Sequence, residues 1–280
     1  MIADQCAKYA DQLFNNMGDY SGFSLVLGAL FFTFQIYCDF SGYSDIALGT
    51  SRLLGIELLR NFAFPYFSRD IAEFWRRWHI SLSSWFRDYL YFPLGGSKGS
   101  SLVTVRNTFI IFLVSGFWHG ANWTFIVWGL LNALYIMPSI WFKTNRTNLD
   151  SVAQGKIFPS IKEFFSMLIT FGLTVFAWIF FRAPSLQAAL TYIQRMFSQL
   201  FNPSSLYQTK RLLSNEIGWI LPCLLLLFLL IEWMGRESQY ALANIGLNWP
   251  KGVRWSLYYA LIIAIIIFSE SEQQFIYFQF

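Results

Sequence analysis

This 280-residue chain has little charge and little histidine. Only 13% of its residues are charged, roughly half the share found in soluble domains, and it contains two histidines and three cysteines. A net charge of +4, with no dense run of Lys or Arg, is too small to neutralise a phosphate backbone, so we expect no nucleic acid partner. Cys6, Cys38 and Cys223 form no CxxC pair and no metal-ligand spacing, so we predict free thiols and no metal site.

Several familiar catalytic motifs are also missing. The chain has no P-loop, no GxGxxG fingerprint and no HExxH. No serine stands in a recognisable triad with histidine and aspartate. The first residues lack the basic region and apolar core of a signal peptide, so we expect the internal apolar segments to direct membrane insertion. We predict no bound cofactor.

Apolar and aromatic residues are in excess instead, at 55% and 20% of the chain. Lipid offers no partner for open backbone groups, so long apolar segments must be helical. The pattern predicts an all-α, multipass transmembrane protein, with one membrane domain over residues 1–280. Five stretches approach the ~20 residues that a helix needs to cross a bilayer: residues 23–38, 123–142 (with a shorter lead-in at 109–118), 164–181, 217–233 and 255–268.

Residues 51–106 separate the first two spans and have a different character. They carry eight Lys or Arg against four Asp or Glu, and an excess of positive charge between spans favours the cytoplasmic side. Within them, Asp70 and Glu73 have the spacing of a helix N-terminus, and Pro93 would end that helix near residue 91. We expect an amphipathic helix that is interfacial or re-entrant, with a second candidate at residues 184–202.

The histidines are candidate proton acceptors because imidazole titrates near neutral pH. His119 lies between Trp118 and Asn122, and apolar aromatic surroundings favour the neutral ring that a general base needs. A histidine that only joins helices by a hydrogen bond would fit this position as well. His79 follows Trp75, Arg76, Arg77 and Trp78, and we expect the two cations to lower its pKa. Alternatively, His79 has no catalytic role and is an interfacial helix residue that is hydrogen-bonded to a backbone carbonyl.

Two polar clusters complete the candidate site. Asp39, Ser41, Tyr43 and Asp45 stand where the first span ends, so they suit a substrate path or, equally, a polar exit loop. A second group of cations could meet the phosphates of a thioester carrier, although ordinary cytoplasmic positive charge explains them too: Arg60, Arg69, Arg76, Arg77 and Arg87.

Long, ordered sequence blocks are spread over nearly the whole chain: residues 35–47, 61–66, 73–83, 87–96, 118–123, 177–184 and 275–280. In these blocks the chain resembles the membrane-bound O-acyltransferase superfamily, and within it the bacterial alginate O-acetyltransferase branch.

This resemblance implies a ring of transmembrane helices around a tunnel, with acetyl transfer to a hydroxyl acceptor. It implies that His119 is the essential residue and His79 the second one. It further implies a cytoplasmic thioester donor such as acetyl-CoA or an acyl carrier, membrane or periplasmic partners that modify an exported polysaccharide such as alginate, and a bacterial inner-membrane location. The expected substrate or donor pocket comprises Asp39, Ser41, Tyr43, Asp45, Trp75, Arg76, Arg77, Trp78, Trp118 and Asn122.

Members of that family usually carry several more N-terminal spans, so we expect this chain to be an N-terminally truncated member. Two functions of other classes therefore stay open. One is a transporter in which His119 and Asp39 or Asp45 relay protons. The other is an inactive scaffold that only docks partners. A scaffold would tolerate loss of His119, and a transporter would not need a thioester donor.

Overall fold

The computed structural model describes residues 1–244 and 246–267, which form helices and no strands. The predicted all-α class is confirmed. The described α-helices are α1 (Ile2–Asn15), α2 (Gly22–Leu53), α3 (Ile71–Arg77), α4 (Ile80–Phe86), α5 (Ser101–His119), α6 (Trp123–Trp141), α7 (Ile161–Arg182), α8 (Leu186–Leu200), α9 (Pro203–Leu212), α10 (Ile220–Gly235) and α11 (Lys251–Ile267). A short 3₁₀ helix, η1 (Pro65–Phe67), and two short π-helical segments, η2 (Arg87–Tyr91) and η3 (Leu213–Ile217), accompany them.

Four of the described helices, α2, α5, α6 and α7, are long and apolar enough to cross a membrane. A fifth candidate is the segment formed by α9, η3 and α10, which bends by 95°. Two expectations need correction. Residues 109–118 belong to α5, a full-length helix rather than a lead-in to the next span. The predicted fourth span, residues 217–233, is shifted toward the C-terminus, because the chain bends before α10 begins at Ile220. The last residue of the predicted fifth span, and the block at 275–280, lie outside the described residues.

Helix α2 is much longer than the apolar stretch that predicts it. Its 32 residues extend about 48 Å at 1.5 Å per residue, well beyond the ~30 Å hydrocarbon layer. The polar residues 39–45 therefore continue a helix and do not form an exit loop. The helix persists because Phe40, Ser44 and Leu48 remain buried along one of its faces.

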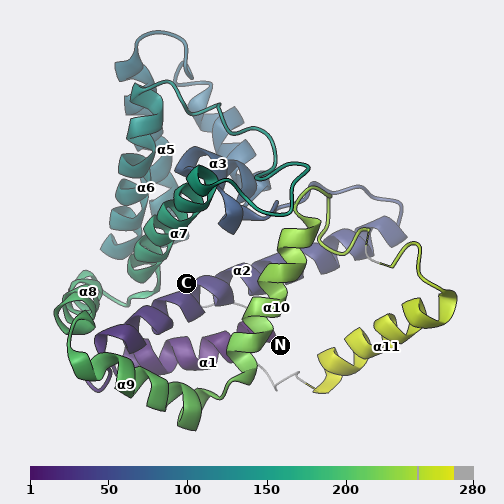
Figure 1. The fold of residues 1–280 in the computed structure, drawn as a ribbon. Helices are drawn as coiled ribbons and strands as arrows, with labels where there is room; N and C mark the ends of the chain where they lie inside the picture. The colour runs from purple at the N-terminus through teal and green to yellow at the C-terminus, as the bar shows by residue number, and fades with distance from the viewer. Residues whose placement is uncertain (245, 268–280) are drawn as a thin grey trace.

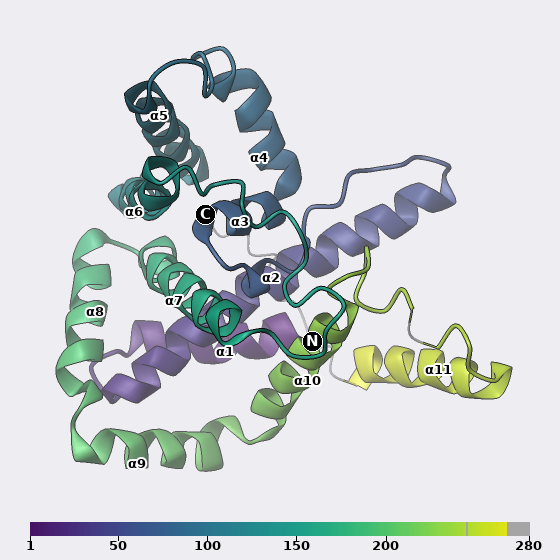
Figure 2. The same cartoon turned by 45° about the horizontal axis from the view of Figure 1, so that its top comes forward.

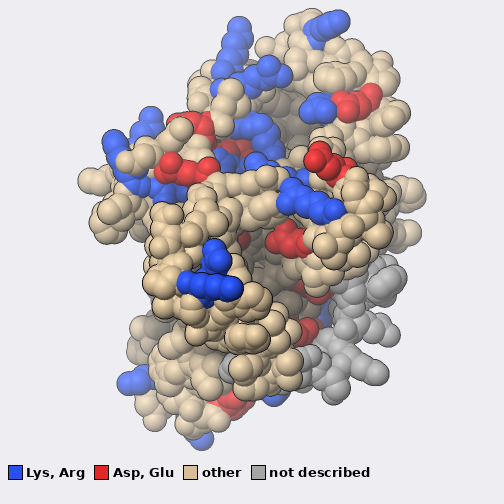
Figure 3. All heavy atoms as spheres, turned by 90° about the vertical axis from the view of Figure 1, so that its right-hand side faces the viewer, with Lys and Arg blue, Asp and Glu red and all other residues tan. Residues whose placement is uncertain are grey.

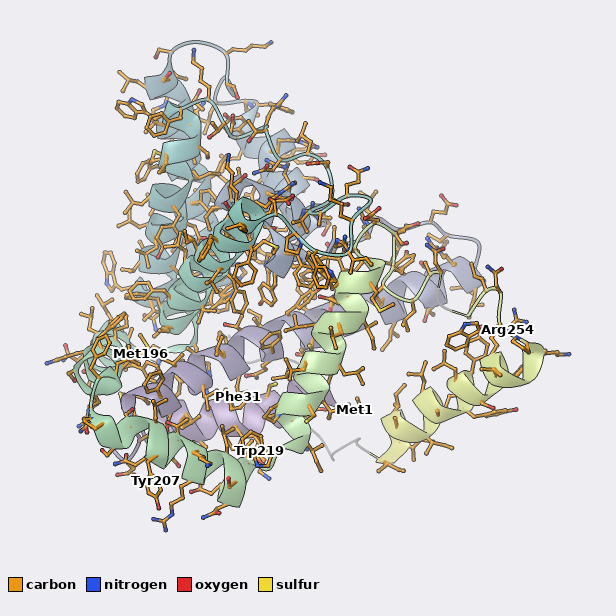
Figure 4. The ribbon with its side chains drawn as sticks, in the orientation of Figure 1. Met1, Phe31, Met196, Tyr207, Trp219 and Arg254 are labelled. Atoms are coloured by element: carbon orange, nitrogen blue, oxygen red, sulfur yellow. The ribbon has the colours of Figure 1, made fainter. Side chains whose placement is uncertain are left out.

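The helices form two groups that meet at an aromatic core (Figures 1 and 2). Helices α1 and α2 pack side by side, with α8 and α9 flanking them, while α5 and α6 form a close pair with α7 beside it. The short helix α3 lies between α2 and the α5–α6 pair. Side chains crowd this interior, whereas Tyr207 on α9 projects outward (Figure 4).

Two glycines bring α5 and α6 unusually close. A Cβ on Gly116 would lie 2.4 Å from the backbone oxygen of Phe125, and one on Gly129 would lie 2.3 Å from that of Phe112. Only glycine allows two backbones to approach so closely. This contact fixes the second half of α5, which carries His119 at its end.

A buried ion network fastens α3 to the loop before α7. The carboxylate of Glu73 is 1% exposed and accepts hydrogen bonds from the Arg69 backbone at 2.7 Å and from Arg77 at 2.7 Å. Arg69 also donates to Asp150 at 2.9 Å and to Glu163 at 3.3 Å. Burial alone would lower the pKa of Arg69, but its hydrogen bonds and charge interactions with Glu73 and Asp150 raise that pKa above its ordinary value. Asp70 caps α3 as expected by accepting from the Glu73 backbone at 2.7 Å.

Candidate active site

Both histidines line one cavity. Although they are far apart in the sequence, His79 and His119 face one space of about 150 Å³. All helices from α2 to α7 contribute residues to its lining. The cavity is mostly apolar, which suits a site from which water is excluded. Its other lining residues are Ile36, Trp75, Trp78, Leu82, Ser83, Phe86, Ile111, Phe112, Ser115, Trp128, Trp178 and Phe181.

His79 reaches this cavity through a break in the backbone. The single helix predicted from Asp70 to residue 91 is wrong, because α3 ends at Arg77 and α4 begins at Ile80. His79 between them adopts a left-handed conformation with φ of 43°, which is costly for a residue with a side chain. Asn61 supports the break: its backbone oxygen accepts from the Ile80 backbone at 3.0 Å, and its Oδ1 accepts from the Ser81 hydroxyl at 2.5 Å.

The surroundings of His79 favour an uncharged ring. Its imidazole lies edge-on to Phe40, with ring centroids 4.6 Å apart, and burial lowers its pKa to about 4. The sequence led us to expect that Arg76 and Arg77 would cause this shift, but burial is the cause. Arg76 donates to the backbone oxygens of Asn145 and Asn148, and Arg77 pairs with Glu73.

His119 is the last residue of α5 and is enclosed by rings. Its imidazole lies 4.9 Å from the Trp118 ring, 5.3 Å from that of Trp128 and 5.0 Å from that of Phe181, centroid to centroid. Ser115 stands one turn earlier on α5 and lines the same cavity. A proton acceptor and a hydroxyl therefore face one small apolar space.

The structure separates the tryptophan and asparagine candidates. Trp75 and Trp78 line the histidine cavity. Trp118 contacts the His119 ring but is 53% exposed and is not among the lining residues. Asn122 was expected in the pocket, but it does not line the histidine cavity and acts as a helix cap. Its side chain caps α6 by accepting from the Thr124 backbone at 3.1 Å and donates to the Pro184 oxygen at 3.0 Å.

The polar residues of α2 do not join the histidines. Ser41 and Asp45 line a different hollow of about 340 Å³, Tyr43 is 57% exposed, and Asp39 is half-buried. Aromatic rings intervene, since Phe40 and Trp78 each contact Phe62 edge-on at 5.0 and 5.1 Å. These four residues are therefore not part of the described histidine cavity.

Three of the chain's arginines surround a hollow that adjoins the histidine cavity. Arg76, Arg87 and Arg146 line a space of about 440 Å³. Its inner wall includes three residues that also line the histidine cavity: Ser83, Ile111 and Phe112. A larger hollow of about 680 Å³ on the other side of α3 is lined by four cations, Arg60, Arg76, Arg77 and Arg236. Arg69, which the sequence suggested as a phosphate ligand, instead pairs with Glu73, Asp150 and Glu163.

Sequence reasoning missed Ser115, Arg146 and Glu232. Ser115 stands four residues before His119, a spacing that puts both on one helix face. Glu232 is an isolated acid inside the apolar run of α10, a pattern that marks a functional group in membrane proteins. No comparable local signal distinguishes Arg146, because its loop is brought over α5 and α6 only by the fold.

Several known proteins are similar in sequence to this chain. Residues 9–181 match the model of the membrane-bound O-acyltransferase family. The chain is 41% identical over 239 residues to the probable alginate O-acetylase of Pseudomonas aeruginosa, covering 85% of this chain and 43% of that protein. It is 33% identical over 292 residues to the peptidoglycan O-acetyltransferase of Helicobacter pylori, covering all of this chain and 54% of that one.

A more distant relative is the teichoic acid D-alanyltransferase of Streptococcus thermophilus, 35% identical over 168 residues, or 55% of this chain and 40% of that protein. The chain thus spans about half the length of the curated relatives that it matches. The histidine cavity, the apolar helices and these matches lead to one conclusion: the chain belongs to the membrane-bound O-acyltransferase family.

Proposed function

We propose that this chain carries the acyl-transfer site of a membrane O-acetyltransferase that modifies an exported polysaccharide. The observation that carries the proposal is the meeting of His79 and His119, the two histidines of the sequence, at one apolar cavity. The acetyl group and the polysaccharide acceptor are supported by the two O-acetylating relatives, whose names specify alginate and peptidoglycan.

In this mechanism, a ring nitrogen of His119 accepts the proton of the acceptor hydroxyl while that oxygen attacks the carbonyl carbon of a thioester. The new C–O bond forms, the C–S bond breaks, and the proton passes to the leaving thiolate, so the histidine returns to its neutral form. A positioned general base contributes typically ~10²–10⁴ in rate. Ser115 lines the same cavity, and its hydroxyl would donate to the carbonyl oxygen as charge develops there, while His79 would position the donor.

The hollow beside the cavity supports a phosphate-bearing thioester donor. Arg76, Arg87 and Arg146 would hold the donor's phosphates, because guanidinium groups match phosphate geometry. A carrier arm would then pass between Ser83 and Phe112, which line both spaces, and present its thioester to the histidines. Both acetyl-CoA and an acyl carrier have such an arm and such phosphates.

The distribution of cations supports a location in the bacterial inner membrane, crossed several times. The arginine-lined hollows would face the cytoplasm, where positive loops are retained and thioester donors are made. The acetyl group would then pass to membrane or periplasmic partners that act on the exported polysaccharide.

The decisive experiment measures acetylation of exported polysaccharide in cells that carry wild-type or variant chain. We expect His119→Ala to lower acetylation by about 100-fold or more, because the general base is lost, and His79→Ala to lower it by roughly tenfold through donor positioning. Phe117→Ala is the matched control on the same helix, since Phe117 is 66% exposed and lies outside the cavity lining; it should acetylate normally.

Protein amounts in the membrane must be equal for the comparison to hold. Normal acetylation by His119→Ala at an equal amount of protein would refute the mechanism and favour a scaffold. Normal acetylation by cells depleted of thioester donor would favour the transporter.

A further inference from the structure

Another hollow, with several polar side chains in a largely apolar and aromatic lining, is separated from the histidines by Phe40, Phe62 and Trp78. It has a volume of about 340 Å³ and lies between α2, α10 and the loop at residues 239–242. Figure 3 shows the side of the molecule that lies to the right in Figure 1, where both red carboxylate and blue basic side chains border a recess. The polar lining residues are Tyr37, Ser41, Asp45, Glu232, Gln239 and Tyr240.

Glu232 is the central residue of this hollow. It is 6% exposed, and its Oε1 accepts a hydrogen bond from the Tyr37 hydroxyl at 2.5 Å. Its Oε2 is buried and accepts no hydrogen bond within the described part of the chain. Buried polar atoms nearly always have a partner, so Oε2 indicates a missing hydrogen-bond donor.

The remaining lining specifies what kind of donor fits. Asp45 adds a second carboxyl, and the Ser41 hydroxyl adds another acceptor. Five aromatic rings surround them, those of Tyr37, Phe62, Phe64, Phe228 and Tyr240. Aromatic faces attract cations. No Lys or Arg is among the described residues that line this hollow, so none of these side chains supplies a positive charge from within the lining.

We propose that this hollow binds a primary ammonium group. Such a group supplies the N–H that Oε2 lacks, together with a charge that suits two carboxyls and an aromatic wall. A quaternary ammonium carries the same charge but no N–H, so it would leave Oε2 unsatisfied. The ammonium comes from either an ethanolamine phospholipid headgroup or a free small amine.

Two arginines at the outer edge of the hollow suit a phosphate next to the ammonium. Arg52 lies over the Tyr240 ring, 5.3 Å from its centroid, and Arg60 donates to the Gln239 oxygen at 3.2 Å. Both arginines therefore contact polar residues of the lining without being part of the lining themselves. A zwitterionic headgroup would place its ammonium inside, at Glu232, and its phosphate toward these cations.

The test uses the full chain in detergent and native mass spectrometry with two lipids of identical acyl chains. We expect phosphatidylethanolamine to be retained about tenfold more than phosphatidylcholine, a difference of one charged hydrogen bond. Glu232→Gln should abolish this preference, because the amide oxygen still accepts from Tyr37 but the negative charge is gone. Glu57→Gln, at an exposed acid of a nearby loop, is the matched control and should keep the preference.

Should Glu232→Gln fail to fold, Asp45→Asn at the edge of the hollow provides the second variant, with a partial loss expected. Competition by free ethanolamine at millimolar concentration would identify a soluble amine as the source, and lack of competition would identify the lipid. Equal retention of the two lipids by wild type together with no binding of free ethanolamine, or an unchanged preference in both variants, would overturn the proposal. Because the readout is binding, the outcome is independent of the acyl-transfer mechanism.

Discussion

At the scale of single residues, His79 shows how local strain and function coincide. Its left-handed backbone, with φ of 43°, costs roughly 1–2 kcal/mol for a residue with a Cβ. Asn61 offsets this cost by satisfying donors at the start of α4. Strained residues persist where the surroundings fix them and cluster at functional sites. The break turns the imidazole toward His119, which a continuous helix through residues 70–91 would not do.

Burial of His79 leads to a prediction about pH. Its folded pKa is about 4 and its unfolded pKa is about 6.5, so between these values the unfolded state binds more protons. Stability therefore falls as pH drops from 6.5 towards 4. At pH 5 we expect the loss to be about 1 kcal/mol after allowance for partial exposure, which lowers the unfolding temperature in detergent by about 2–4 °C.

His79→Gln is the control for this prediction because it removes the titrating group and keeps a polar side chain. The unfolding temperature of the variant should fall less than that of wild type between pH 7 and pH 5. Identical falls in the two proteins would show that other groups, such as His119, account for the whole effect.

At the scale of elements, the contact between α5 and α6 determines where His119 stands. We expect Gly129→Ala to destabilise the protein by about 1–3 kcal/mol, the usual cost of overpacking, because the new Cβ would lie 2.3 Å from the Phe112 oxygen. The two helices would have to separate, and the wall of the histidine cavity would move with them. Thermal unfolding in detergent measures the change.

Gly172→Ala on α7 is the matched control, since a Cβ there meets nothing within 4 Å. Alanine in an open helix position stabilises by roughly 0.5–1 kcal/mol, so this variant should unfold slightly later than wild type. Unfolding of Gly129→Ala at or above the wild-type temperature would contradict the close-packing argument.

The elements also show what the sequence can predict. Apolar runs predict α6 and α7 well, because lipid forces such runs into helices. The break at His79 was not predictable, since Asn61 holds it from outside the local sequence. The extension of α2 through Asp45 was missed because burial of Phe40 and Leu48 depends on neighbours distant in the chain.

Some residues of the candidate site could be predicted from the local sequence, and others could not. The two histidines and Trp78 were found from residue type and surroundings. Asn122 was misplaced, because its role as a helix cap depends on the Pro184 oxygen. The separation of Asp45 from the histidines depends on the three-dimensional position of Phe62, which local spacing does not determine.

At the scale of the whole molecule, positive charge is unevenly distributed. Lys and Arg gather over the upper part of the face in Figure 3, and residues 51–106 alone carry eight of them. The loop between α6 and α7 adds Lys143, Arg146 and Lys156, and Arg76 fastens it to α3. Helix α9 follows the opposite end of α7. Loops rich in Lys and Arg stay in the cytoplasm. We therefore expect the loop between α6 and α7 on the cytoplasmic side of the membrane and α9 on the opposite side.

Labelling of single cysteines tests this orientation in a variant with Cys6, Cys38 and Cys223 replaced by alanine. With Lys156→Cys, a membrane-impermeant maleimide should react only after the cells are permeabilised. With Tyr207→Cys, on exposed α9, it should react in intact spheroplasts. The opposite result would place the arginine-lined hollow outside, away from cytoplasmic thioesters, and would exclude the donor path proposed above. Labelling of both positions from one side would mean that α7 does not separate them across the bilayer.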